Sequence, residues 1–218
     1  MTDPFLARLP AFKKLPAPVL AEISGRLILR KYRKGEPVFE EGSLADAVHL
    51  LRTGLVKAVK YSPNSELSAM EIIGPGQLFG MIAVMDDKPY PVSAIPLSTS
   101  EAYRIPSATF ASLLADHPGF SKQVYALVGD HLRQSQALRA LSGETVDRRI
   151  AYVLCVLSES MGAVLPVRRE DIAEIAGCSQ ATAIRTLVAF RKRGIISSGW
   201  KRVTILDTRR LLKLIERG

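Results

Sequence analysis

The 218-residue chain is short of several residue types, and each shortage excludes a class of protein. Its two cysteines, Cys155 and Cys178, form no Cys-x-x-Cys pair, which argues against a disulfide framework or a zinc site. No apolar run approaches the ~18 residues of a membrane span, and the N-terminus lacks the basic-then-apolar pattern of a signal peptide. We therefore expect a cytoplasmic protein with no metal site and no membrane partner.

Positive charge is plentiful but unevenly distributed. The chain has 30 Lys and Arg against 21 Asp and Glu, a formal net charge of +9. Residues 1–142 hold 16 basic and 13 acidic side chains, a net of +3, whereas residues 143–218 hold 14 and 8, a net of +6. This asymmetry is typical of a nucleic-acid-binding module joined to a more neutral one. The alternative is a solvated helical surface rich in arginine.

Residues 27–105 alternate short β-favouring runs with turn residues such as Gly35, Gly42 and Gly54. Strands that are short and closely spaced predict a closed antiparallel barrel or jelly roll. The expected strands cover residues 27–32, 37–39, 48–52, 55–61, 67–73, 77–79, 92–96 and 101–105.

After Pro106 the apolar spacing becomes helical, with a short helix at 107–115 and a long one at 120–141. The long helix has ~22 residues and a length of about 33 Å, more than one small domain needs. We expect it to pair with a second copy in a short coiled coil, with a hinge at Ser142-Gly143; the alternative is a helix that lies on the barrel. The expected dimer seam consists of Val124, Leu127, Val128, His131 and Leu138.

The last third contains the sharpest motif. Two predicted helices, 168–175 and 180–192, flank a turn centred on Gly177, and Ser179 is a good N-cap for the second helix. This order is the helix-turn-helix layout. Two β runs, 195–198 and 202–206, follow Gly194 and predict a hairpin wing, so the whole resembles a winged helix.

The geometry of this motif assigns roles on DNA. The first turns of the second helix enter the major groove, where Gln180 and Ala181 would face bases and Arg185 suits the O6 and N7 acceptors of guanine. Arg185 could instead be a solvated helix-face arginine. The residues expected near phosphates are Arg169, Ser179 and Thr182, with Lys201 in the wing.

Nearly the whole chain resembles the catabolite activator / fumarate-nitrate regulator (CRP/FNR) family of bacterial transcription factors. The resemblance rests on segments 34–42, 54–57, 74–80, 147–151 and 171–179, together with Arg185. It implies an α+β fold: a cyclic-nucleotide-binding-like β jelly roll that senses an effector (1–115), a dimerisation helix and hinge (116–142), and a winged helix-turn-helix domain (143–218). It also implies a homodimer on a palindromic operator in double-stranded DNA, and contact with RNA polymerase if the protein activates.

Departures from the family pattern bear on the effector. Cyclic-nucleotide members have Glu and Arg where this chain has Met81 and Val92, so we expect neither cAMP nor cGMP. The N-terminus has no cysteine for an iron–sulfur cluster. The expected effector pocket is mostly apolar: Phe79, Gly80, Met81, Ile82, Met85, Val92 and Ser93.

Two interpretations of that pocket remain open. It could take a hydrophobic molecule, including haem, since segment 88–94 resembles nitric-oxide-responsive members; or its apolar residues only fill the barrel, and the protein binds DNA without an effector. Binding of cAMP or cGMP through non-standard contacts is a further alternative. We expect His49, His117 and His131 to be structural. An enzyme is not expected, because no metal triad, Ser-His-Asp set or phosphate loop is present.

Overall fold

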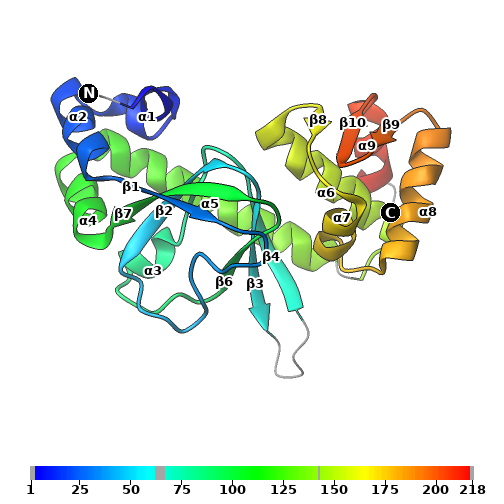
Figure 1. The fold of residues 1–218 in the computed structure, drawn as a ribbon, viewed down its shortest axis with the longest axis horizontal. Helices are drawn as coiled ribbons and strands as arrows, with labels where there is room; N and C mark the ends of the chain where they lie inside the picture. Colours follow the sequence, from blue (N-terminus) through cyan, green and yellow to red (C-terminus); the bar gives the residue numbers. More distant parts are fainter. Residues whose placement is uncertain (1–2, 62–66, 142, 217–218) are drawn as a thin grey trace.

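The computed structural model describes residues 3–61, 67–141 and 143–216 (Figure 1). The chain begins with two short helices, α1 (Pro4–Arg8) and α2 (Ala17–Arg26), joined by a 3-10 turn, η1 (Phe12–Lys14). Their buried side chains, Leu6, Phe12 and Ile23, pack into one cluster with Phe110 and Phe120 from later helices. These N-terminal helices therefore cover one end of the barrel.

The barrel consists of two antiparallel sheets, as the sequence predicts. One has the order β1-β7-β2-β5 and the other β4-β3-β6. Both faces of β7 are covered: Ala102 belongs to the cluster between the sheets, whereas Tyr103 and Ile105 pack with the N-terminal helices. The first sheet contains β1 (Ile28–Tyr32), β2 (Ala47–Thr53), β5 (Leu78–Phe79) and β7 (Ser100–Pro106), and the second contains β3 (Val56–Tyr61), β4 (Leu67–Ile73) and β6 (Ser93–Pro96).

Three helices follow or interrupt the strands. The short α3 (Met81–Met85), which the sequence did not predict, begins at Gly80, whose φ of 77° requires the left-handed region open to glycine. After α4 (Ser107–Asp116), the 24-residue α5 (Pro118–Leu141) runs behind the barrel to the C-terminal part (Figure 1). One face of α5 contacts β4, so the long helix also forms a wall of the barrel.

The C-terminal part is a winged helix. Its core is built by α6, α7 and α8 against a three-stranded sheet of order β8-β10-β9. The short β8 and the terminal α9 are additions to the predicted elements. The bounds are α6 (Val146–Met161), β8 (Val164–Leu165), α7 (Arg169–Ile175), α8 (Gln180–Lys192), β9 (Ile196–Gly199), β10 (Arg202–Ile205) and α9 (Thr208–Glu216).

The barrel and the winged helix share part of one core. Leu55, Ile72 and Leu97, all from the barrel, belong to the same buried cluster as the side chains of α6 and α7. Two ion pairs lie beside this cluster: Lys34 Nζ is 2.7 Å from Asp171 Oδ1, and the buried Lys57 pairs with Glu174. Helix α7 is therefore held against the barrel by both apolar and charged contacts.

Within the described ranges, no helix is long and apolar enough to cross a membrane.

Candidate functional site

Helices α7 and α8 are held together by small buried residues and a tight turn. Ile172 and Ala173 of α7 and Ala183 of α8 are buried where the helices meet. Gly177 has a φ of 60°, which lets the chain reverse between them. Ser179 caps α8, because its Oγ accepts a hydrogen bond from the Thr182 N–H at 3.2 Å. The turn and cap together set the angle at which α8 leaves the domain.

The first two turns of α8 present polar side chains to solvent. Gln180, Ala181 and Arg185 are exposed, whereas Leu187 and Phe190 point into the core. The Arg185 guanidinium is oriented by a 3.2 Å hydrogen bond from Nη2 to Thr182 Oγ1. The three side chains predicted to face base edges thus occupy one exposed surface.

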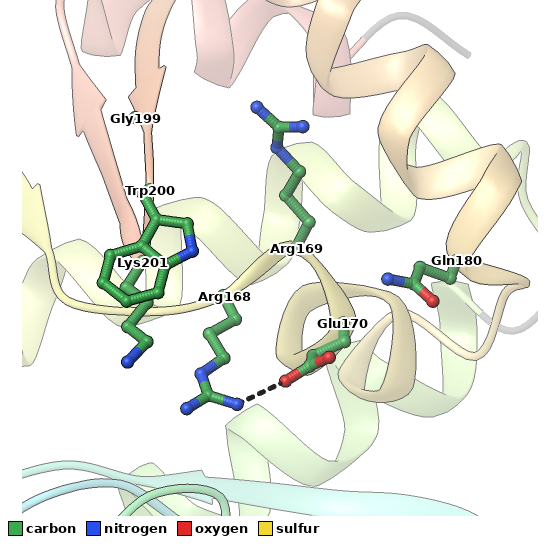
Figure 2. Close-up of a pocket in the computed structure, with 7 residues that line it drawn as sticks. All are labelled: Arg168, Arg169, Glu170, Gln180, Gly199, Trp200 and Lys201. Carbon is green, nitrogen blue, oxygen red and sulfur yellow. Dashed lines mark hydrogen bonds and ion pairs between the residues drawn. The ribbon is translucent and has the colours of Figure 1, made fainter.

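A depression of about 580 Å³ separates the start of α8 from the wing (Figure 2). Gln180 lies on one side and Trp200 on the other, with Arg168 and Arg169 between them. Its one acidic lining residue, Glu170, is 2.8 Å from Arg168 Nη1, and this hydrogen bond lowers the pKa of the Glu170 carboxyl. The full lining is Arg168, Arg169, Glu170, Gln180, Gly199, Trp200 and Lys201.

The tip of the wing is a two-residue turn with unusual occupants. Gly199 pairs with Arg202, which leaves Trp200 and Lys201 to make the reversal. Lys201 has a φ of 53°, in the left-handed region that non-glycine residues rarely adopt. Trp200 is 86% exposed, and Lys201 Nζ lies 4.0 Å from the centre of its ring, within cation–π range.

A second, much smaller cavity of about 60 Å³ lies inside the barrel. Five of the seven predicted pocket residues line it: Phe79, Gly80, Met81, Ile82 and Val92. The other two do not, because Met85 packs against the N-terminal cluster and Ser93 Oγ accepts a hydrogen bond from the Glu41 N–H. Tyr90, which the sequence also placed around the pocket, lines it as well, and the lining residues that the sequence did not indicate are Phe39, Ala58, Glu71, Ile73, Ala83, Pro91 and His131.

Two buried histidines lie in or near this cavity. His131 of α5 has its Nδ1 2.9 Å from Glu71 Oε1 of β4, while its Nε2 is buried without a hydrogen-bond partner. His49 lies between Phe39 and Phe79, with ring centres 5.5 and 5.4 Å away, and its Nδ1 also lacks a partner. Burial lowers the pKa of His49 to about 4, so its ring is neutral at physiological pH.

Comparisons with known proteins cover both parts of the chain. Residues 29–117 match the cyclic nucleotide-binding domain, and residues 148–214 match the Crp-like helix-turn-helix domain. The transcriptional activator protein Anr of Pseudomonas aeruginosa is 30% identical over 85% of this chain and 79% of its own length. The CRP-like cAMP-activated global transcriptional regulator of Mycobacterium tuberculosis is 27% identical over 97% and 98%. The structure of FixK2 from Bradyrhizobium japonicum has a TM-score of 0.75 at 20% identity, over 88% and 98%.

The chain belongs to the CRP/FNR family of transcriptional regulators. Its C-terminal part is therefore a DNA-binding helix-turn-helix domain, and the two relatives named above, which match most of the chain, are transcriptional regulators. In this CRP/FNR regulator the predicted DNA-contacting residues come together around one surface: α8 supplies four, Ser179 caps that helix, and Arg169 and Lys201 line the adjoining depression.

The residues of the predicted dimer seam on α5 lie partly against the barrel. Val124 is completely buried in the regulator's own core, Leu127 and Val128 pack against that core, and His131 faces Glu71. Val124 and His131 therefore face the barrel, whereas Leu127 and Val128 are only half-buried; the Leu138 side chain lies outside the described residues. The apolar side chains exposed on α5 are instead Tyr125 and Leu132, one position further along the same heptad.

Several residues of the depression and the domain contact were absent from the sequence prediction. Trp200 and Arg168 line the depression between α8 and the wing, and Lys57 pairs with Glu174 across the domains. A signal existed for Trp200, since the only tryptophan of the chain stands in a predicted hairpin turn. None existed for the Lys57 pair, because its members are 117 residues apart.

Proposed function

We propose that this CRP/FNR regulator acts as a homodimer that reads a two-fold symmetric operator with α8 and is controlled by a small molecule in its barrel. Residues 1–115 would sense, 116–142 would dimerise, and 143–218 would bind DNA. The observation that carries the proposal is the exposed surface formed by Gln180, Ala181 and Arg185 beside a depression lined by cations. An exposed helix start next to phosphate-binding side chains suits insertion into the major groove.

Operator recognition is tested most directly at Arg185. Arg185→Ala removes a side chain that can bond guanine in bidentate fashion, so operator preference over random DNA should fall by roughly 1–3 kcal/mol. Arg191→Ala, at the other end of α8, removes the same charge from an exposed position and serves as the matched control. Competition binding assays on a duplex obtained by in vitro selection provide the measurement. Equal loss of preference in both variants would refute the role of Arg185.

The dimer would form along α5 through Tyr125 and Leu132. Both are exposed and lie seven residues apart, so they share a face of the helix. Leu132→Glu should place two carboxylates at the centre of the interface and yield monomers in sedimentation experiments. Ala126→Glu adds the same charge to an exposed position on another side of α5 and should leave the dimer intact. A dimer that survives Leu132→Glu would place the interface elsewhere.

The barrel cavity favours an uncharged, largely apolar effector. Its described lining contains no lysine or arginine, and its ionisable members are Glu71, Tyr90 and His131. An anionic cyclic nucleotide would find no cation there to offset the loss of its hydration. A cavity of about 60 Å³ has room for about two water molecules, so the lining does not fit haem in this arrangement. Entry of a ligand would be easiest beside Ile82, whose side chain is 47% exposed.

Strand β3 and helix α5 connect this cavity to the DNA-binding domain. Ala58 of β3 lines the cavity, and the adjacent Lys57 pairs with Glu174 of α7. On the other side, Gln134 of α5 accepts a hydrogen bond from the Ile72 N–H at 2.9 Å. A ligand that displaced β3 or β4 would therefore act on α7 and α5 together, provided that it bound one arrangement more tightly. Ser142 of the expected hinge lies outside the described residues.

Native mass spectrometry of freshly purified protein, followed by operator binding with and without the released compound, tests this control. We expect an extra mass and a several-fold change in operator affinity. Ala58→Leu should fill the cavity and remove the response without preventing DNA binding. Two results together would favour the alternative that the regulator binds DNA without an effector. The operator affinity would be unchanged by every compound from the cell extract, and it would be equal in wild type and Ala58→Leu.

A further inference from the structure

We propose that Trp200 is a DNA-contacting residue that enters the minor groove next to each half-site, where its indole discriminates against G·C pairs. This inference rests on the proposed function, since it requires α8 to lie in the major groove. It adds a second site of sequence discrimination, on the wing, to the one assigned to α8.

The composition of the wing tip indicates that its side chains serve a contact outside the chain. Two-residue hairpin turns favour Asn-Gly or Gly-containing pairs, but this turn consists of Trp200 and Lys201, with Lys201 in the left-handed region. The indole contributes little to the core, because it is 86% exposed. Neither the turn nor the core accounts for a large aromatic side chain at this position.

The position of the tip relative to α8 selects the groove. Figure 2 shows Gln180 on one side of the depression and Trp200 with Lys201 on the other, with Arg168 and Arg169 between them. With α8 in the major groove, the cations between α8 and the wing would lie along one phosphodiester strand. On a duplex, the groove beyond that strand is the minor groove. Trp200 stands at that far side.

The chemistry of the tip matches a minor groove. Proteins that bind this groove often insert apolar side chains at its base steps, and an indole is thin enough to enter a groove about 6 Å wide. Lys201 Nζ lies 4.0 Å from the indole centre, so its charge would arrive with the ring between two rows of phosphates. The indole of Trp200 and the ammonium group of Lys201 would therefore enter the groove together.

A side chain that enters the minor groove can distinguish G·C from A·T pairs by a single chemical group. Guanine projects its N2 amino group into this groove, whereas A·T pairs leave only acceptors there. The amino group would obstruct the indole and lose hydrogen bonds to water beneath it. Flanks of A·T pairs should therefore be preferred, although no side chain of the wing reads them by hydrogen bonding.

The first test uses the fact that Trp200 is the only tryptophan of the chain. Its emission reports the wing tip alone, and acrylamide should quench it readily in the free protein. On an operator obtained by in vitro selection, quenching should become several-fold less efficient. A complex visible by mobility shift, with the indole as accessible as before, would overturn the minor-groove contact and leave operator binding by α8 standing.

The second test changes only the minor groove. Replacing flanking guanines by inosine removes the N2 amino group and leaves the major-groove edge intact. Wild type should bind the inosine duplex roughly fivefold more tightly than the guanine duplex for each altered pair that the indole contacts, in keeping with about 1 kcal/mol per pair. Trp200→Ala should lose this difference and Trp200→Phe should keep part of it. Leu206→Ala, at the base of the same hairpin and also exposed, is the matched control.

These outcomes separate the two proposals. If Trp200→Ala retains the preference for inosine, the wing tip does not read the groove, whatever α8 does. If Arg185→Ala abolishes operator preference while the inosine effect persists, both contacts exist and act independently. Failure of the full-length protein to select any duplex would overturn the proposed function and this inference together.

Discussion

His49 should make the folding stability of this regulator depend on pH between 7 and 5. The ring is 3% exposed between Phe39 and Phe79. Burial is the main reason that its pKa falls from 6.5 to about 4, with a smaller lowering contribution from Arg104 and an opposing one from Asp46. The unfolded chain therefore takes up a proton at a higher pH than the folded one. The contribution of the neutral His49 ring to the folding stability is complete above pH 6.5 and is lost as the pH falls toward 4.

The two pKa values set the size of the effect. With 6.5 in the unfolded chain and about 4 in the folded one, linkage gives a loss of about 2 kcal/mol between pH 7 and pH 5. Below pH 4 the loss from this residue levels off at about 3 kcal/mol. A change of 2 kcal/mol is a large fraction of the stability of a typical domain.

Urea unfolding of wild type and His49→Leu across this pH range measures the contribution. Because His49 Nδ1 has no hydrogen-bond partner, leucine should cost less than about 1 kcal/mol at pH 7. The difference between the two proteins cancels the titration of every other group. His49→Leu should therefore become the more stable protein near pH 5. If the unfolding free energies of the two proteins changed in parallel with pH, the buried neutral ring of His49 would not be the cause of the pH dependence.

Substitutions at three further places test other contacts. Glu174→Ala removes the ion-pair partner of Lys57, whose side chain is 4% exposed. The free energy of unfolding in urea should therefore fall by about 1–3 kcal/mol. Lys57→Met should lower it by less than Glu174→Ala does. Gly54→Ala would place a Cβ 2.2 Å from Ser100 Oγ at a φ of 93°, and calorimetry should record a loss of about 2 kcal/mol or more. Ser179→Ala should destabilise the protein by about 1 kcal/mol and Ser179→Gly by only a few tenths, as thermal unfolding would show; equal losses would exclude capping as the reason.

Elements with strong local signals were predictable from the sequence. The eight β-favouring runs locate all the barrel strands, although the run at 37–39 forms only an isolated bridge between Phe39 and Ala94. Helix α8 has the predicted bounds because a cap and a helical apolar pattern agree there. The sequence pattern did not predict helix α9, although Asp207 accepts a hydrogen bond from the Arg210 N–H at its start.

The open face of α5 could not be predicted in the same way. Heptad spacing is identical for Val124 with His131 and for Tyr125 with Leu132, and a shift of one residue rotates the face by about 100°. Only the barrel, which takes up Val124, decides between them. The cavity lining shows the same limit: Glu71 and His131 meet from elements 60 positions apart, and no local pattern connects them.

The core shared by Leu55, Ile72 and Leu97 with the winged helix has a consequence during synthesis. These three side chains leave the ribosome before the helices that cover them, so a nascent barrel carries an uncovered apolar surface until the last third of the chain is made. Truncated chains that end near residue 142 should need chaperones or aggregate. For the same reason, chimeras that exchange sensing domains between family members will fold well only if these three positions match the new winged helix.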